Sequence, residues 1–296
     1  QNPYWINYRN LRNNNKKRYM LSFSAGYDIL DWMNLSARVR IDNADNIFTQ
    51  KLYASSIATL TEGGLNGHYT EARTYDKQTY ADVILNIDKA LGKDWTIVAN
   101  IGASYNNIGT DELRYGGPIQ DNGLANVFNV FDLDDTKKRA SKSGWNDETQ
   151  SVFGSVELGW KKMLYITATG RNDWASQLAG SSERSFFYPS VGISWVPTSI
   201  WDFGAVNYFK LRASVASVGM PFPRFLTMPT YEYDATNKIW KDKTHYPIGD
   251  LKPERTLTYE VGVETRFWQD LSLNLSWYLA DTYNQTFDPS LPPSSS

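Results

Sequence analysis

Apolar and polar residues alternate along this chain in stretches that come in pairs. In residues 18–29, Tyr19, Leu21 and Phe23 begin an apolar row, and small or polar residues fill the positions between them. After a tight turn at 30–33, residues 35–42 set an aliphatic row against Arg38, Arg40 and an aspartate. Successive side chains of a strand point to opposite faces. Each pair of stretches therefore predicts a β-hairpin whose strands are apolar on one face and polar on the other.

The same unit recurs about five times, and the links between stretches alternate in length. The further pairs are 81–88 with 95–105, 151–160 with 164–171, 187–195 with 209–215, and 257–267 with 271–279. Links within pairs are short, at 89–94, 161–163 and 268–270, and slightly longer at 196–206. Links between pairs are long and polar, at 43–77, 106–148, 172–185 and 219–254. Such loops are uncommon in compact soluble domains, whereas membrane β-barrels have short periplasmic turns and long extracellular loops. We therefore predict an all-β fold, an antiparallel transmembrane β-barrel segment of about ten strands.

Composition narrows the class of protein further. The chain has 296 residues, 41% of them apolar and 15% aromatic, which excludes a disordered chain. No apolar run is long enough for a transmembrane helix. The absence of cysteine excludes a disulfide scaffold and thiol chemistry. A net charge of -2 shows that the chain lacks the excess of basic residues typical of nucleic-acid-binding proteins.

Both ends of the sequence favour a segment of a larger barrel. Residues 1–15 are rich in Asn and Arg and are expected to lie in a loop, without a signal peptide. The chain stops at three serines soon after a strand. The long loops are disproportionate for a closed barrel of ten strands, so we expect the first and last strands of this segment to pair with strands outside residues 1–296.

Several short motifs follow one another in a fixed order. They are NPYW at 2–5, the strand 151–159 followed by Tyr165, ATGRNDW at 168–174, FYPSV at 187–191, KLRAS at 210–214, DLKPERT at 250–256 with YEVGVETRF at 259–267, and NQ at 284–285. This series, above all the LKPE–EVG stretch, resembles the SusC/RagA-like TonB-dependent outer-membrane transporters over essentially the whole chain.

The resemblance implies a barrel of roughly 22 strands with an N-terminal plug. Such a transporter imports a glycan or peptide with energy from TonB-ExbB-ExbD, and a SusD-like surface lipoprotein covers it. Residues 1–296 would be part of the one barrel domain, and the plug, the TonB-contacting part and the remaining strands lie outside them. The implied location is the outer membrane of a Gram-negative, Bacteroidetes-like bacterium, with the lipid bilayer around the strands.

Charged residues on the polar faces are candidates for a network inside the barrel. An unpaired buried charge is costly, so we expect these residues to pair with one another, with neighbouring strands or with a plug. An internal network is a better reading of the RND stretch at 171–173 than direct contact with substrate. The candidates are Arg38, Arg40, Glu157, Arg171, Asp173, Glu260, Glu264 and Arg266. Pro253, which cannot donate to a strand ladder, is expected just before a strand.

Aromatic residues fall into two groups. Those near the short turns are expected to form a girdle at the membrane interface: Trp95, Trp160, Trp195, Trp201 and Trp268. Those in the long links could stack on sugar rings, contact the lid lipoprotein or simply pack within the loops: Tyr69, Tyr115, Trp145, Tyr231 and Trp240.

Signals for catalysis or metal binding are weak. His68 and His245 are isolated from one another and lack the spacing of a zinc site. Two acidic clusters, one at residues 42–46 and the other at Asp134 and Asp135, offer oxygen ligands for a structural calcium ion, but neither matches an EF-hand. No nucleophile-elbow, P-loop or Rossmann motif occurs. We predict a protein that is not an enzyme and has no cofactor.

An alternative class is a soluble all-β module that binds glycans or hydrolyses them. Single alternating strands fit that class equally well. It does not explain the tryptophans at the short turns or the regular alternation of short and long links, so the import barrel is the preferred interpretation.

Overall fold

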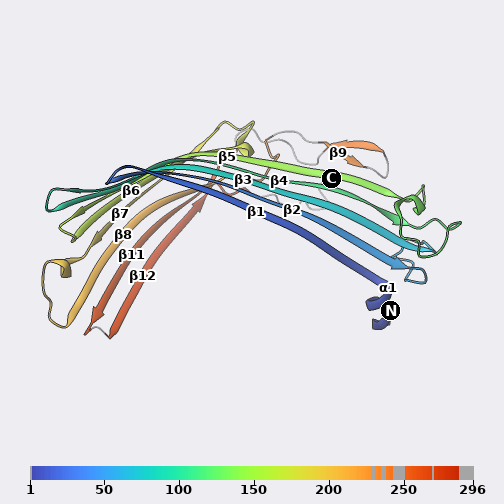
Figure 1. The fold of residues 1–296 in the computed structure, drawn as a ribbon, viewed down its shortest axis with the longest axis horizontal. Coiled ribbons are helices and arrows are strands. Elements are labelled where there is room, and N and C mark those ends of the chain that lie inside the picture. Colours follow the sequence, from blue (N-terminus) through green and yellow to red (C-terminus); the bar gives the residue numbers. More distant parts are fainter. Residues whose placement is uncertain (1, 228–230, 235–237, 243–250, 269, 287–296) are drawn as a thin grey trace, which may run out of the picture.

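The computed structural model describes residues 2–227, 231–234, 238–242, 251–268 and 270–286. Its elements are α1 (Pro3–Arg9), β1 (Asn10–Leu30), β2 (Met33–Tyr53), β3 (Gly67–Leu91), β4 (Trp95–Pro118), η1 (Val130–Asp132), β5 (Arg139–Trp160), β6 (Leu164–Ala175), η2 (Ser176–Leu178), β7 (Phe186–Trp195), η3 (Pro197–Ser199), β8 (Val206–Met220), β9 (Tyr231–Asp234), β10 (Ile239–Asp242), β11 (Glu254–Phe267) and β12 (Leu271–Tyr283). They build one long, curved sheet and a separate small hairpin (Figure 1).

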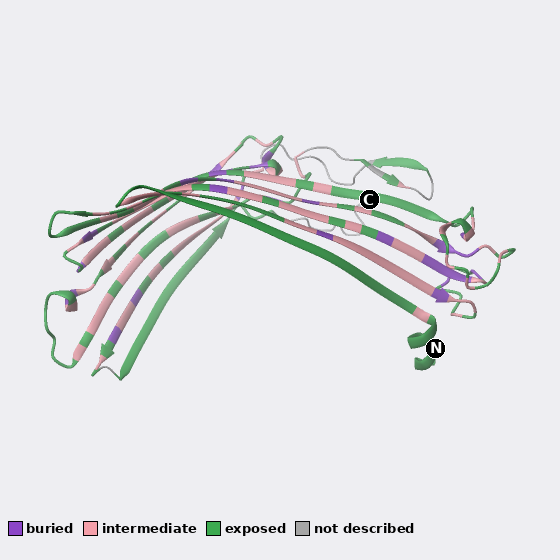
Figure 2. Cartoon of the chain, in the orientation of Figure 1, coloured by how far each residue is buried: buried purple, intermediate pink, exposed green. Residues whose placement is uncertain are grey.

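The large sheet is a ten-stranded antiparallel meander, as the sequence predicts. Its order is β1-β2-β3-β4-β5-β6-β7-β8-β11-β12, and only β9 and β10 leave it to pair with each other. Within the described residues β1 and β12 are the two edges of the sheet. Both are exposed along almost their whole length (Figure 2). The sheet is therefore an open arc.

The strands β2 to β5 are much longer than the alternation of apolar residues predicts. Most of the expected loops 43–77 and 106–148 are strand, and only 54–66 and 119–138 connect the strands. The prediction failed because apolar residues in these strand ends do not alternate regularly with polar ones, as at Ile47 and Phe48, so the period-two signal is missing. Cross-strand side-chain pairs support them instead, for example Arg73 Nη2 with Asp45 at 2.6 Å. We call residues 43–53, 67–79, 106–118 and 139–149 the distal extension.

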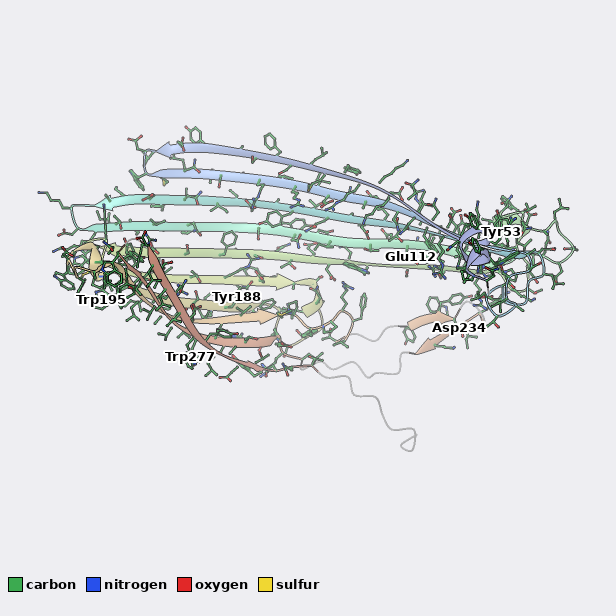
Figure 3. All side chains as sticks on the ribbon, turned by 90° about the horizontal axis from the view of Figure 1, so that it is seen from below. Tyr53, Glu112, Tyr188, Trp195, Asp234 and Trp277 are labelled. Carbon is green, nitrogen blue, oxygen red and sulfur yellow. The ribbon has the colours of Figure 1, made fainter. Side chains whose placement is uncertain are left out.

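Two further expectations were wrong. Residues 2–15 do not form a loop, because Pro3 begins α1, the Asn2 side chain accepts a hydrogen bond from the Tyr4 amide at 2.9 Å, and β1 starts at Asn10. The link 219–254 contains the β9–β10 hairpin, which lies beside the distal end of β5 (Figures 1 and 3). Pro253 immediately precedes β11, as predicted.

The strand register gives the sheet two chemically different faces. One row runs Ala25, Ala37, Val83, Ala103, Val152 across β1 to β5, and the next runs through Leu35, Leu85 and Ile101. We call this side the apolar face. The alternate residues, among them Arg38 and Asp82, form the polar face.

The apolar band has the height expected of a membrane barrel. On β4 it extends from Trp95 to Tyr105, and beyond Tyr105 the same face carries polar residues such as Asn107. Ten steps of about 3.3 Å along a strand tilted by about 40° give about 25 Å, which is the height of the apolar band in outer-membrane barrels. The distal extension therefore projects past the band.

Burial on the two faces is inverted relative to a soluble protein. Phe23, Ile101 and Val191 on the apolar face are more than half exposed, whereas Asp82 and Asp173 on the polar face are buried. A contiguous exposed apolar surface of this extent needs an apolar partner. A bilayer around the apolar face provides one.

Glycine on the polar face makes room for aromatic rings from the neighbouring strand. A Cβ on Gly102 would lie 2.6 Å from Phe153 Cζ and 2.9 Å from the Val83 carbonyl oxygen. Overpacking of this kind forces side chains away from their preferred rotamers.

We expect Gly102→Ala to lower the free energy of unfolding by about 1–2 kcal/mol. The matched control is Gly192→Ala on the same face, where the added Cβ meets nothing closer than 3.6 Å. Urea titration of both variants in the complete protein measures the difference, and equal stabilities would contradict the close approach of Phe153.

Candidate functional site

A row of polar side chains crosses the middle of the polar face. Arg38 faces Asp82 across β2 and β3, and the row continues through Ser104 and Ser151 to Asp173 on β6. Arg38 donates to Asp82 Oδ2 from Nε at 3.0 Å and from Nη2 at 2.7 Å. The Asp82 carboxylate, which sequence reasoning did not select, is buried, so the arginine provides the pairing that a buried charge requires.

A second cluster surrounds Asp173. Arg171 Nε donates to Asp173 Oδ1 at 2.7 Å, and Arg171 Nη2 donates to Ser151 Oγ at 2.8 Å. The Tyr188 hydroxyl donates to the other oxygen of Asp173, and the Arg171 guanidinium lies over the Phe153 ring, 5.5 Å from its centroid. The buried Asp173 carboxylate thereby joins β6 to β7, and Arg171 links this pair to β5. Arg171 and Asp173, two candidates of the sequence analysis, pair with each other.

The other predicted members of the network pair mainly with neighbouring strands. Glu157 accepts a hydrogen bond from Thr167 at 3.1 Å, and Glu260 receives Arg212 Nη2 at 3.2 Å. Arg212 also donates to Ser276 at 2.6 Å.

The remaining three predicted residues lie on β2 and β11, the strands next to the two edges of the sheet. Arg40 contacts Asp42 at 3.3 Å, and Asp42 also receives Arg18. Glu264 and Arg266 lie on β11 opposite Lys210 and Tyr208 of β8. All eight predicted residues are on the polar face, but they form several local clusters along the sheet. Parity along the strands also identifies Asp82 and Arg212, which the sequence analysis left out of the candidate set.

The connection after β8 packs against the polar face. Phe222 forms a small core with Leu178 of η2 and Phe186 of β7. Arg224 Nε contacts Asp147 of β5 at 2.6 Å, and its guanidinium lies 3.6 Å from the centroid of the Trp145 ring. From the sequence, Trp145 is expected in a loop, where it could contact substrate or the lid lipoprotein or pack within the loop. Here it lies on β5 and holds this connection to the sheet.

Tyr69 and Tyr115 come together, but on strands and away from Trp145. Both belong to the distal extension, on the side that continues the apolar face, and Tyr115 is directly opposite Glu71. The Tyr69 hydroxyl donates to Glu71 Oε2 at 2.6 Å. Burial and the hydrogen bond with Glu71 raise the pKa of Tyr115 to about 12. Both hydroxyls therefore remain protonated donors at physiological pH.

Tyr231 and Trp240 lie on the separate hairpin, and both are well exposed. They do not meet Tyr69 or Tyr115, because the hairpin lies on the polar-face side of the distal extension. Tyr233 and Asp234 of β9 and Lys241 of β10 border a cavity of about 540 Å³ there. The opposite wall comes from β3, β4 and β5 and includes His68, Arg114 and Arg139. Sequence reasoning missed this cavity because its two walls are distant in the chain.

Tryptophans do collect at the short-turn end of the sheet. Trp95 faces Trp160 across β4 and β5, with ring centroids 6.4 Å apart, and Trp195 extends the same row on β7. Trp201 and Trp268 are more than half exposed in two turns that touch, since the Trp268 amide donates to the Ala205 carbonyl at 3.1 Å. At the other end of the band lie Tyr105 and Trp174. A role at the membrane interface remains a prediction.

The acidic clusters do not assemble into a calcium site. Asp42 and Asp45 point to opposite faces of β2 and each pairs with arginine, and the hydrogen bonds from Arg73 lower the pKa of Asp45. Asp134 accepts from the Thr136 amide and hydroxyl, which lowers the pKa of Asp134. Within the described part of the chain, no three His, Asp or Glu side chains are placed together so that they could hold a metal ion.

Comparison with solved structures identifies the fold. Two structures of RagAB, described as a peptide importer in its open-open state and as a peptide transporter, match 99% of this chain with a TM-score of 0.81 at 15% and 16% identity. The chain spans 32% and 33% of those two chains. The ferric-catecholate import receptor Fiu from E. coli K12 matches 93% of this chain with a TM-score of 0.51 at 12% identity, and this chain spans 42% of it. No curated protein matches the sequence.

Two further observations concern the class of protein to which this chain belongs. Among the residues that the structure describes, no helix is both long and apolar enough to cross a membrane. The family model described as TonB dependent receptor-like, beta-barrel matches residues 1–296, the whole of the chain. This match decides against the soluble glycan-binding or hydrolase alternative. The chain therefore belongs to the TonB-dependent receptor-like β-barrel family, whose members lie in the outer membrane of Gram-negative bacteria and are not enzymes.

Proposed function

We propose that this chain is the central to C-terminal barrel segment of a SusC-like importer that takes up a nutrient oligomer, a glycan or a peptide. The observation that carries the proposal is the two-faced sheet, which exposes an apolar band outward and pairs its charges on the polar face. That polar face lines the lumen. Energy comes from TonB-ExbB-ExbD through a plug and a TonB-contacting part outside residues 1–296, and a SusD-like lipoprotein covers the extracellular end.

The open edges of the sheet support the assignment to part of a larger barrel. β1 and β12 each pair with one neighbour only among the described residues. Unpaired backbone groups in hydrocarbon cost several kcal/mol each. Strands from the rest of the complete protein therefore pair with β1 and β12 and close the barrel.

The proposed substrate class, a glycan or a peptide, rests on the resemblance of the sequence to SusC/RagA-like transporters. RagAB is described as a peptide importer, and its identity of 15–16% to this chain carries the fold alone. A direct test deletes the gene for the complete protein and measures uptake of labelled peptide and glycan oligomers. Loss of uptake of either class supports the proposal, and uptake unchanged for both classes argues against it.

The two connections at the end of the distal extension support a binding place for the lid lipoprotein there. Residues 54–66 and 119–138 are held together, because Asn66 Nδ2 donates to the Gln120 carbonyl at 2.8 Å and the Ala54 amide donates to Asn126 Oδ1 at 2.7 Å. At their tips Leu65, Leu124 and Phe131 are 74%, 78% and 91% exposed. Exposed apolar side chains on connections that lie beyond the apolar band fit a protein partner.

We expect the double substitution Leu124→Ser with Phe131→Ser to weaken lipoprotein binding at least tenfold, because it removes apolar anchors from the interface. Co-purification of the lipoprotein with the complete transporter measures the effect. The control is Val152→Ser, which removes an apolar residue from the membrane band and leaves the two connections intact. Undiminished co-purification of the double variant would assign the lid contact to another part of the protein.

A further inference from the structure

The distal cavity has the size and position of a binding site for a small chemical group. Its volume of about 540 Å³ lies within the range of ligand pockets. It lies at the end of the polar face that is remote from the short turns, between the distal extension and the β9–β10 hairpin (Figure 3). On the proposed function, an imported molecule passes this point before it enters the lumen.

Three cationic side chains line the cavity. Arg114, Arg139 and Lys241 carry three positive charges, and Glu62 and Asp234 carry two negative charges. Arg139 Nη2 lies 3.1 Å from Glu62, and Lys241 pairs with Asp234. Arg114 is held less firmly, since its Nε lies 3.7 Å from Glu112. Each of the three cations thus has a carboxylate partner, and Arg114 has the longest of the three contacts. Its guanidinium group is therefore the one most readily available to the carboxylate of a ligand, which its donor geometry fits.

A buried histidine in the cavity wall is the second, independent observation. His68 is 7% exposed, and its Nδ1 has no hydrogen-bond partner. Its Nε2 lies 3.9 Å from Glu62 Oε1, which is too long for a hydrogen bond. Burial lowers the pKa of His68, so the ring is neutral at physiological pH. Nδ1 is enclosed by the protein, so the ring nitrogen of His68 that a ligand in the adjoining cavity can reach is Nε2, which makes no hydrogen bond in the described structure.

We propose that this cavity binds a carboxylate of the imported oligomer. Arg114 and Arg139 supply the charge-assisted hydrogen bonds, His68 supplies one further hydrogen bond, and the hairpin closes the site from the lumenal side. The carboxylate is either the C-terminus of a peptide or the acid group of a uronic sugar. This inference rests on the proposed import function and adds a chemical requirement for the cargo.

The test measures binding to the complete transporter by isothermal titration calorimetry with four probes. They are tri-alanine, tri-alanine amide, tri-galacturonic acid and neutral maltotriose. We expect at least one acidic probe to bind at least tenfold more tightly than its neutral counterpart. Preference for tri-alanine over its amide identifies a peptide terminus, and preference for tri-galacturonic acid over maltotriose identifies an acidic sugar. Equal binding of acid and neutral probes in both pairs overturns the proposal.

Substitutions in the cavity give effects of opposite sign. Arg139→Gln and Arg114→Gln should each weaken binding of the preferred acid about tenfold, and Glu62→Gln should strengthen it, which a misfolded variant would not do. The matched control is Lys142→Gln, because Lys142 lies on β5 near Arg139 but on the other face. Unchanged binding in both arginine variants rejects the site.

Failure of this inference is distinguishable from failure of the import function. If the transporter imports labelled oligomers but makes no distinction between acid and neutral forms, the import proposal stands and the carboxylate site falls. If deletion of the gene leaves uptake of every oligomer unchanged, the import proposal itself is rejected.

Discussion

Val156→Arg is expected to destabilise the folded barrel by about 2–4 kcal/mol, whereas Ser155→Arg should have a much smaller effect. Val156 lies on β5 in the row with Ala99 and Ala168, near the middle of the apolar band. An arginine there places its charge in hydrocarbon. Ser155 is the adjacent residue and faces the polar side opposite Asn100 and Thr169, where water and nearby carboxylates solvate a guanidinium.

Urea titration of folding into bilayers, made on the complete protein, measures both values. The two variants differ by one position and introduce the same residue, so the change in net charge is matched. If Val156→Arg proves no more destabilising than Ser155→Arg, either the facing of β5 or its place in the membrane is wrong.

Asp173→Asn is expected to lower the free energy of unfolding by about 2–3 kcal/mol. The buried Asp173 carboxylate accepts from both Arg171 and Tyr188. The amide keeps the shape of the side chain but removes the charge and brings an N–H group toward donors. Charge-assisted hydrogen bonds in a buried site are about twice as strong as neutral ones, so their loss is costly.

The matched control is Asp111→Asn in the distal extension. Asp111 is more than half exposed and lies 3.5 Å from Lys77, and exposed pairs of this kind contribute about 0–1 kcal/mol. Both variants are compared by the same urea titration. A loss at Asp173 no greater than that at Asp111 would show that the Arg171 cluster is dispensable for the fold.

The ten strands and their facing follow from the sequence wherever a strand crosses the apolar band. There, one face meets hydrocarbon and the other a polar lumen, so the period-two pattern is strong in stretches such as 95–105 and 151–160. The same parity places Arg38, Glu157 and Arg171 on the polar face. Their partners depend on register, because Arg38 reaches Asp82 only when β2 and β3 pair as they do.

The distal extension shows where this signal ends. Past Tyr105 and Ile41 apolar residues no longer alternate regularly with polar ones, so residues 43–53 and 106–118 read as loops although they are strand. Their order comes from cross-strand pairs such as Arg73 with Asp45 and from hydrogen bonds between backbones. Neither has a local pattern that a single sequence reveals.

The sequence by itself determined the class of fold, the number of strands in the sheet, the two faces and the short-turn end, because each depends on alternation within a strand. Only the tertiary structure decided which charges pair, that Trp145 holds the connection after β8 through Arg224, and that Tyr69 and Tyr115 meet at Glu71. The tertiary structure also creates the cavity between His68 and Lys241, two residues that are far apart in the chain. These features require strands and connections that are distant in sequence to be placed side by side, and that placement is set by register and packing across the whole sheet.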